Sequence, residues 1–174
     1  MTTSPLITPA SGLGNGYGSV NPFAVVKGPG GARGFIEFLG DVFDGRETPE
    51  AHADDTDGLL IHAEVRIGDS CLMIADSKPD WVFTPALLQV NVTGCDEVLR
   101  RAKAHGAQVI TETTPFYGAA SLARFIDPWS NVWWLFGPAI EGAPEPSWDP
   151  DAETGESTVH ATICRAMREL RPPR

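Results

Sequence analysis

The sequence predicts an α+β fold in which one β-α-β-β-β unit occurs twice. The first observation is an internal repeat, because Gly28 maps onto Gly94 and Gly40 onto Gly106 at one offset of 66 residues. In each half, an apolar strand comes before this pair of glycines and an amphipathic segment lies between them. The second observation is that each half closes with an apolar strand after a tight turn. A repeat of this kind indicates a duplicated unit that cannot bury its sheet face alone. We therefore expect the two modules to pair and a ligand to bind between them.

The first module is predicted over residues 20–79. An apolar, β-branched run predicts a buried first strand, and apolar residues on one face of the next segment predict a helix, although its interior glycines cost roughly 1 kcal/mol each. An acidic segment then predicts an exposed loop with a short strand near Thr48, followed by a hairpin. The predicted elements are the strand Val20–Val26, the helix Gly30–Phe43, the loop Gly45–Gly58 and the hairpin strands Leu60–Ile67 and Cys71–Ala75.

The second module, predicted over 86–138, follows a linker at Lys78–Pro85. Its helix has the clearest signals, because acidic residues stand in the first turn, basic residues stand near the end, and Gly106 follows as the cap. The predicted elements are the strand Leu87–Val92, the helix Cys95–His105, a strand Gln108–Glu112, a loop Thr113–Ala120, and the strands Leu122–Ile126 and Asn131–Phe136. One helix among four strands in each half excludes the doubly wound parallel plan.

The two ends of the chain lie outside the repeat. Residues 1–19 are rich in Gly, Ser, Thr and Pro, which predicts a flexible arm. Residues 139–174 begin with a Pro/Glu-rich connector and end in a predicted helix, Ser157–Leu170. We expect this helix to pack on the domain or on a partner through one apolar stripe. The stripe consists of Val159, Ile163, Cys164, Met167 and Leu170.

Charge and cysteine content exclude several classes of function. The formal net charge is −10 and no Lys/Arg cluster occurs, which argues against nucleic-acid and anionic-membrane partners. No stretch approaches the ~20 apolar residues of a membrane span, and the N-terminal residues do not resemble a signal peptide. Three widely spaced cysteines predict reduced thiols and a cytoplasmic location rather than a disulfide framework.

Histidines and carboxylates offer weak catalytic signals. Phosphate-loop, nucleophile-elbow and zinc-protease motifs are missing from the sequence. His62 opens an alternating strand on which His62, Glu64 and Arg66 share one face. That face either lines a pocket or is the solvated side of an edge strand.

Aromatic residues gather in the linker, in one loop and around the last strand. Alternation places Trp133 and Trp134 on opposite faces of the sheet, so one packs against a helix and the other faces the concave side. An aromatic-lined cavity suits a planar organic ligand, although each aromatic residue taken singly is better explained as core. The set comprises Trp81, Phe83, Phe116, Tyr117, Trp129, Trp133 and Trp134.

Three segments resemble the glyoxalase/bleomycin-resistance/dioxygenase superfamily, also called vicinal oxygen chelate proteins, and most closely its PhnB-like branch. They are Val20–Val26, His62–Asp76 and Phe125–Trp134, in the order of the duplicated unit. The resemblance covers residues 20–138. It implies two paired β-α-β-β-β modules that form a cupped mixed β-sheet with the helices outside, often in a homodimer.

The resemblance also implies where a metal would be bound. Metal-dependent members place ligands on the first and last strands of each module. Those positions fall on Asn21 or Pro22, on Met73 or Leu72, on Leu87 and on Trp134. Since Met, Leu and Trp do not hold a hard divalent ion, we expect no metal and no other cofactor, and an apolar, aromatic site in its place.

These expectations lead to a metal-independent protein that binds a small hydrophobic or aromatic molecule and sequesters or carries it. The acidic surface would favour a cationic ligand over a distance of ~8 Å. The ligand-binding residues are expected to be His62, Met73, Leu87, Phe116, Tyr117, Trp129 and Trp134. The alternative is an isomerase, lyase or cyclase that uses His62, Glu64, Tyr117 and Asp76 as acid/base groups. A regulatory partner that uses the tail helix is a third possibility. The partners expected are a small molecule and a second copy of the chain.

Overall fold

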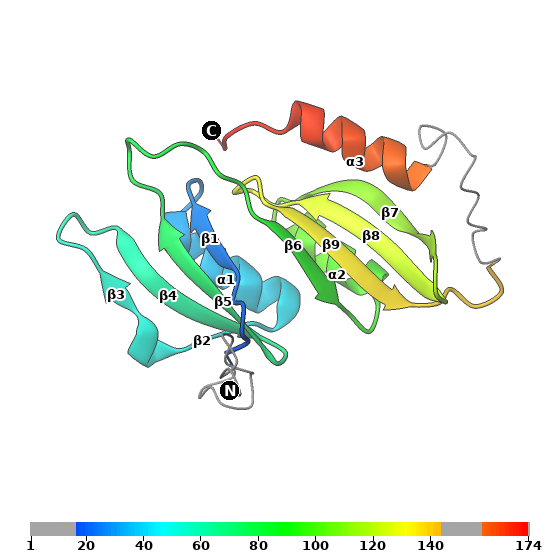
Figure 1. Cartoon of the computed structure of the whole chain (residues 1–174), viewed down its shortest axis with the longest axis horizontal. Helices are drawn as coiled ribbons and strands as arrows, with labels where there is room; N and C mark the ends of the chain where they lie inside the picture. Colours follow the sequence, from blue (N-terminus) through cyan, green and yellow to red (C-terminus); the bar gives the residue numbers. More distant parts are fainter. Residues whose placement is uncertain (1–16, 144–157, 174) are drawn as a thin grey trace, which may run out of the picture. The chain divides into compact units, whose positions relative to one another are not determined.

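The computed structural model describes residues 17–143 and 158–173. The chain divides into two compact units, residues 1–84 and 85–174. Each unit contains a sheet and a helix that follows its first strand (Figure 1). The predicted α+β class and the β-α-β-β-β order are both confirmed. Of the predicted N-terminal arm, only Tyr17, Gly18 and Ser19 lie in the described residues, and most of the predicted connector lies outside them.

The first unit has its strands in the order β1-β5-β4-β2, and the short strand β3 also pairs with β4. β1 runs parallel to β5, whereas β4 is antiparallel to β5, β2 and β3. The predicted short strand near Thr48 is two short strands separated by a 3₁₀ turn. The elements are β1 (Phe23–Val26), α1 (Gly31–Phe43), β2 (Arg46–Glu47), η2 (Pro49–Ala51), β3 (Ala53–Asp54), β4 (Leu60–Ile67) and β5 (Ser70–Asp76).

The second unit repeats this order as β6-β9-β8-β7, again with one parallel pair, β6 with β9. The strand order is thus the same in both sheets, as duplication predicts. The predicted strands at 108–112 and 122–126 are both longer than expected. The elements are β6 (Leu87–Asn91), α2 (Cys95–Ala104), β7 (Gln108–Phe116), β8 (Ala120–Ile126), β9 (Val132–Pro138) and α3 (Thr158–Glu169).

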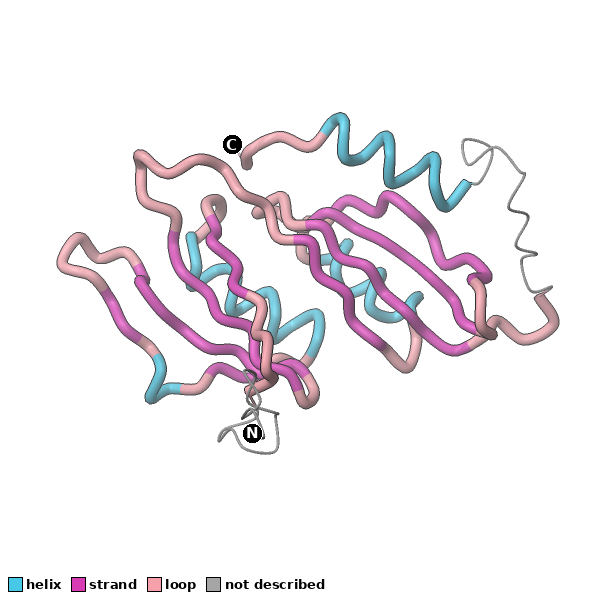
Figure 2. Tube along the Cα trace, in the orientation of Figure 1, coloured by secondary structure: helices cyan, strands magenta, loops and turns pink. Residues whose placement is uncertain are grey.

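The hydrophobic core of each unit lies between its sheet and the helix after its first strand, which lies behind the sheet in Figure 2. In the first unit, the buried face of α1 includes Phe35, Leu39 and Val42. Alternate residues of β4 and β5 are buried as well. In the second unit, α2 is anchored by Leu99 and Ala102. Side chains on the opposite face of each sheet are left for other contacts.

The start of α1 depends on a carboxylate from the end of β5. The Asp76 carboxylate accepts hydrogen bonds from the Ala32 N–H at 2.7 Å and from the Leu60 N–H at 2.8 Å. Gly31 has φ 59°, and a Cβ there would lie 2.5 Å from Asp76 Oδ1, so only glycine allows this approach. A negative charge at a helix N-terminus is also favourable. Asp76 therefore holds backbone groups in place rather than pointing at a ligand.

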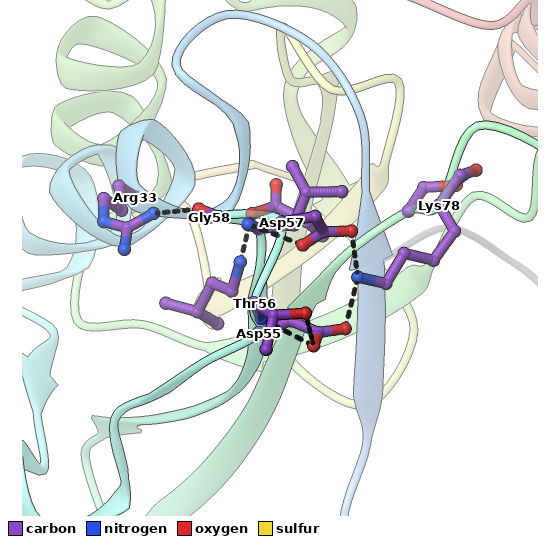
Figure 3. A network of polar contacts seen from close by, with 10 residues as sticks. Arg33, Asp55, Thr56, Asp57, Gly58 and Lys78 are labelled. Carbon is purple, nitrogen blue, oxygen red and sulfur yellow. Dashed lines mark hydrogen bonds and ion pairs between the residues drawn. The ribbon is translucent and has the colours of Figure 1, made fainter.

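The acidic loop before β4 is held by two basic residues of the same unit (Figure 3). Lys78 donates hydrogen bonds to Asp55 at 2.8 Å and Asp57 at 2.7 Å. Arg33 forms an ion pair with Asp54 at 2.5 Å. Lys78 begins the predicted linker, so these contacts fix where the linker leaves the first sheet.

None of the described helices is long and apolar enough to cross a membrane.

Candidate functional site

The two sheets carry opposite charges at equivalent positions. Glu64 lies opposite Met73 in the β4–β5 pair, and Arg124 lies opposite Trp134 in the β8–β9 pair. These strands hold the same places in their sheets, so the two pairs correspond. Glu64 is 7% exposed and Arg124 is 2% exposed. Each unit thus has a buried charged side chain at the centre of one face.

That face is the one turned away from the helix that covers each core. A Cβ on Gly137 would meet the Cys95 sulfur of α2 at 2.9 Å, so Gly137 and, by alternation, Trp133 face α2. Trp134 then faces the other side together with Arg124. The prediction that Trp133 and Trp134 occupy opposite faces is confirmed. Trp133 is 1% exposed, whereas Trp134 is only partly buried.

In the first unit, four side chains form what we call the Glu64 cluster: Tyr17, His62, Glu64 and Cys71. The Tyr17 hydroxyl donates to Glu64 Oε1 at 2.5 Å, and His62 Nε2 lies 3.3 Å from the same oxygen. The Cys71 thiol lies 3.8 Å from Glu64 Oε2. The predicted shared face of His62 and Glu64 is therefore confirmed. It is not the side of an edge strand, because β4 pairs with β5 on one flank and with β2 and β3 on the other.

Hydrogen bonding and burial set the protonation of this cluster. The hydrogen bond from Tyr17 is the largest influence on Glu64 and lowers the pKa of its carboxyl, although partial burial acts in the opposite direction. The same bond raises the pKa of Tyr17. Burial and the nearby carboxylate raise the pKa of the Cys71 thiol. Glu64 is therefore a carboxylate at neutral pH and a weaker base than an ordinary glutamate, and Cys71 is a protonated thiol.

In the second unit, the corresponding face carries aromatic rings around Arg124, and we call it the Arg124 face: Phe116, Arg124, Trp134 and Phe136. The guanidinium carbon lies 3.7 Å from the centroid of the Trp134 ring, which is a close cation–π contact. Trp134 stacks on Phe136 with centroids 6.4 Å apart, and Phe116 packs edge-on against Phe136 at 5.5 Å. Flat rings beside one buried cation form a surface suited to a planar organic molecule.

The C-terminal helix α3 covers part of this face. Arg124 Nη1 donates to the Val159 carbonyl at 2.7 Å, and the Thr111 and Thr162 hydroxyls lie 2.8 Å apart. In Figure 1, α3 runs along β7, against which it packs. The prediction that this helix packs on the domain is confirmed, but the predicted stripe is wrong at Met167, which is 46% exposed. Ala166, 6% exposed, is buried instead, because the helix turns its threonine and small residues toward the polar groups of the sheet.

Four of the seven predicted ligand-binding residues lie on the faces described above, two in each unit. His62 and Met73 share the face of the first sheet that carries Glu64. Phe116 and Trp134 both contact Phe136 in the second unit. Leu87, on the edge strand β6, is 58% exposed. Tyr117, in the turn after β7, is 40% exposed and packs edge-on against Phe116.

Trp129 and Asp127 belong to the turn before β9. Trp129 is buried, and its backbone N–H donates a hydrogen bond to Asp127 Oδ1 at 2.9 Å. The Asp127 carboxylate also accepts bonds from the Asn131 N–H, from the Asn131 side-chain amide and from the Trp133 indole N–H at 2.8 Å. Burial raises the pKa of Asp127 to about 6 against the effect of these donors. This carboxyl holds a turn together.

At three of the four positions where the resemblance implies metal ligands, the side chains do not fit a divalent ion. Met73 offers a thioether, Leu87 offers no donor atom and Trp134 offers only an indole N–H, which cannot coordinate a metal. Arg124 also places a positive charge beside Trp134. Among residues 17–143 and 158–173, no group of three or more His, Cys, Asp and Glu side chains is arranged to hold a metal ion.

Three residues of these faces were not predicted from the sequence. Arg124 is a charged residue between Leu122 and Ile126 in a predicted strand, and this alternation is a signal that could have placed it on one face. Phe136 was predicted only as the end of a strand. Tyr17 gave no signal, because nothing in a Gly/Ser-rich segment indicates a hydrogen bond to Glu64.

Comparison with known proteins finds similarity in structure only, since no family model and no curated protein matches the chain. A protein of Pseudomonas aeruginosa, PA1353, aligns over 70% of this chain and 98% of its own at TM-score 0.56 and 20% identity. The PhnB protein of Bacillus cereus, described as a putative 3-demethylubiquinone-9 3-methyltransferase, aligns over 67% and 96% at TM-score 0.52 and 19% identity.

A third similar structure is a glyoxalase/bleomycin resistance protein/dioxygenase family enzyme of Burkholderia phytofirmans PsJN. It aligns over 71% of this chain and 97% of its own, at TM-score 0.51 and 20% identity. The duplicated order of strands, the two mixed sheets and these structures agree. The chain has the fold of the vicinal oxygen chelate superfamily.

Proposed function

We propose that the protein binds a small aromatic molecule without a metal and sequesters or carries it. The observation that carries this proposal is the set of rings on the Arg124 face, where Trp134, Phe136 and Phe116 contact one another on the side of the sheet away from α2. Stacked and edge-on rings offer a large, rigid contact area for a planar ligand. The lack of hard oxygen ligands at Met73, Leu87 and Trp134 supports metal-independent binding.

The test uses the ligand that the protein itself retains. Native mass spectrometry of protein purified without denaturation identifies any bound small molecule, and titration of that molecule into ligand-free protein gives its Kd. Trp134→Ala should raise the Kd about tenfold or more, which corresponds to the loss of about 1.4 kcal/mol or more of ring contact. Trp81→Ala is the matched control, because it removes the same ring from a position that is 52% exposed and is not one of the four residues of the Arg124 face. Equal Kd values for the two variants would refute a site on the Arg124 face.

An enzymatic function is the second candidate, and the Glu64 cluster favours it. A carboxylate within reach of a tyrosine hydroxyl and an imidazole is an arrangement that can move a proton. The reaction classes that fit are isomerisation, elimination and cyclisation of a small organic substrate. If the retained molecule is converted to another on incubation, His62→Ala should lower kcat by at least about a hundredfold while the melting temperature stays within a few degrees. Unchanged turnover would exclude His62 as an acid/base group.

A homodimer and a cytoplasmic location are parts of the same proposal. A stable interface between two copies of the chain would bury more than ~1,000 Å². Light scattering at micromolar concentration tests the dimer, and a monomer would contradict it. The three free cysteines, of which Cys71 and Cys95 are buried, support a reducing compartment.

A further inference from the structure

Arg124 is a buried cation whose hydrogen bonds are only partly satisfied. Its Nη1 reaches the Val159 carbonyl at 2.7 Å and the Thr111 hydroxyl at 3.4 Å. Its Nε is buried and has no hydrogen-bond partner among the described residues, and neither has the buried indole Nε1 of Trp134 beside it. Two donors on one face, both out of contact with water, therefore lack an acceptor.

The charge of Arg124 also has no counterion among the residues that the structure describes. No carboxylate of residues 17–143 or 158–173 forms an ion pair with it, although the chain carries 23 acidic residues. Burial lowers the pKa of Arg124 to about 10. A guanidinium taken out of water is costly unless an anion accompanies it. A backbone carbonyl and a ring face compensate for this cost only in part.

The position of α3 relative to the core of the second unit would allow the helix to be displaced from the sheet. On the sheet side, α3 presents the Val159 carbonyl, the Thr162 hydroxyl and the small side chain of Ala166. The apolar side chains of Val159 and Ile163 are only half-buried, and Met167 is 46% exposed. The core of this unit lies on the other face of the sheet, where Trp133 stacks on Phe125 and α2 buries Leu99. Displacement of α3 would therefore leave that core intact.

We propose that Arg124 and Trp134 bind a planar organic oxyanion, such as an aromatic carboxylate, and that α3 covers this site until the oxyanion replaces the Val159 carbonyl at the guanidinium. The ring of the ligand would stack on the Trp134–Phe136 surface. This inference rests on the proposed function and adds the charge of the ligand and its route of entry. It also replaces the cationic ligand that the net charge suggested, because the nearest charge on this face is positive.

A reversible disulfide tests the cover. The Thr111 and Thr162 hydroxyls lie 2.8 Å apart, so cysteines at both positions can join α3 to β7. The full chain carries Thr111→Cys, Thr162→Cys and Cys164→Ser, the last to remove a competing thiol on α3. The probe is 8-anilinonaphthalene-1-sulfonate, a fluorescent aromatic anion. Reduced protein should bind it about tenfold or more tightly than oxidised protein, whereas a control without Thr111→Cys should respond to oxidant by less than about twofold.

A second pair of variants moves the helix without a disulfide. Ala166→Gln places a longer polar side chain at a buried position, and Met167→Gln makes the same change at the neighbouring exposed one. Ala166→Gln should bind the probe several-fold more tightly than Met167→Gln and should speed amide hydrogen exchange in α3. Equal affinity of the oxidised and the reduced protein for the probe would overturn the proposal that α3 covers the site. It would also be overturned if Ala166→Gln and Met167→Gln differed in exchange but bound the probe equally well.

Two probes, one with a sulfonate and one without it, test whether the site requires an anionic ligand. N-phenyl-1-naphthylamine has the same rings and no charge. In reduced protein, Arg124→Met should weaken binding of the sulfonate about tenfold or more and change binding of the uncharged amine by less than about twofold. Arg124→Gln takes its place if Arg124→Met does not fold. Equal effects on the two probes would overturn the anion site.

The two failures can be told apart. If the uncharged amine binds in a Trp134-dependent way while the sulfonate gains nothing from Arg124, the proposed function survives and this inference fails. If neither probe responds to Trp134→Ala or to release of α3, the Arg124 face is not a binding surface and both fail.

Discussion

Loss of the Trp133 side chain should destabilise the second unit more than any other single aromatic truncation on β9. Trp133 is 1% exposed, stacks on Phe125 with centroids 6.0 Å apart, and donates its indole N–H to Asp127 at 2.8 Å. Truncation of a buried Trp to Ala costs about 3–5 kcal/mol, and removal of a donor from a buried carboxylate adds about 1–2 kcal/mol. We therefore expect Trp133→Ala to lower the free energy of unfolding by about 5 kcal/mol.

Two further variants divide this loss into its parts. Trp133→Phe keeps a ring on Phe125 but removes the donor to Asp127, so it should cost about 2 kcal/mol. Trp134→Ala, on the other face and only partly buried, should also cost about 2 kcal/mol, since its ring contacts Arg124 and Phe136 rather than the core.

Urea unfolding followed by far-UV circular dichroism measures these differences. With an m-value of about 2 kcal/mol/M, a loss of about 5 kcal/mol would move the midpoint of the second unit's transition by about 2.5 M. Trp133→Phe and Trp134→Ala should each move it by about 1 M. If Trp133→Ala moved the midpoint no further than Trp134→Ala, the assignment of the core to the α2 side of the sheet would be wrong.

Three other predictions concern protonation and metal. The Asp127 carboxyl should titrate near pH 6 by NMR, and because its pKa is raised in the folded state, it should add stability as the pH falls from about 6 toward 4; a midpoint below about 4 would contradict its burial. Tyr17→Phe should raise the pKa of Glu64, so that stability is lost at a higher pH on acidification, whereas Tyr117→Phe should not; identical acid limbs would exclude the Tyr17 bond. Elemental analysis should find less than stoichiometric zinc, nickel, manganese or iron, and one bound equivalent would refute metal independence.

Much of the fold could be predicted because its signals are local. The helix α2 has acidic residues in its first turn, basic residues near its end and Gly106 at φ 87°, as the pattern required. The repeat then fixed the order of elements in both halves. The predicted end of β7 at Glu112 is wrong, because Pro115 indicates a loop by its residue type but lies within the strand. β7 lies at the edge of its sheet, where the N–H that a proline lacks is not needed for a hydrogen bond to a second neighbouring strand.

The candidate site was predicted less completely because its contacts are not local. Alternation along one strand correctly separated Trp133 from Trp134 and joined His62 to Glu64. The partner across the sheet depends on register, and no pattern in β8 alone shows that Arg124 stands opposite Trp134. Contacts from the chain ends, by Tyr17 and Val159, depend on folding of segments outside the repeat.

The two units share one arrangement at the positions where the resemblance implies metal ligands. In both units the last strand lacks a metal ligand, and the neighbouring strand places a buried charge opposite that position, Glu64 opposite Met73 and Arg124 opposite Trp134. Each buried charge is then met by a group from outside the repeat, the Tyr17 hydroxyl or the Val159 carbonyl. A guanidinium 3.7 Å from the Trp134 ring centroid opposes any cation there, since two unit charges about 4 Å apart repel by roughly 4 kcal/mol near a protein surface. A glutamate introduced at position 134 would pair with Arg124 rather than with a metal ion. For a carboxylate at position 134 to bind a metal ion, position 124 would also have to carry a neutral residue. The positive charge of Arg124 on β8 therefore keeps this face suited to anions.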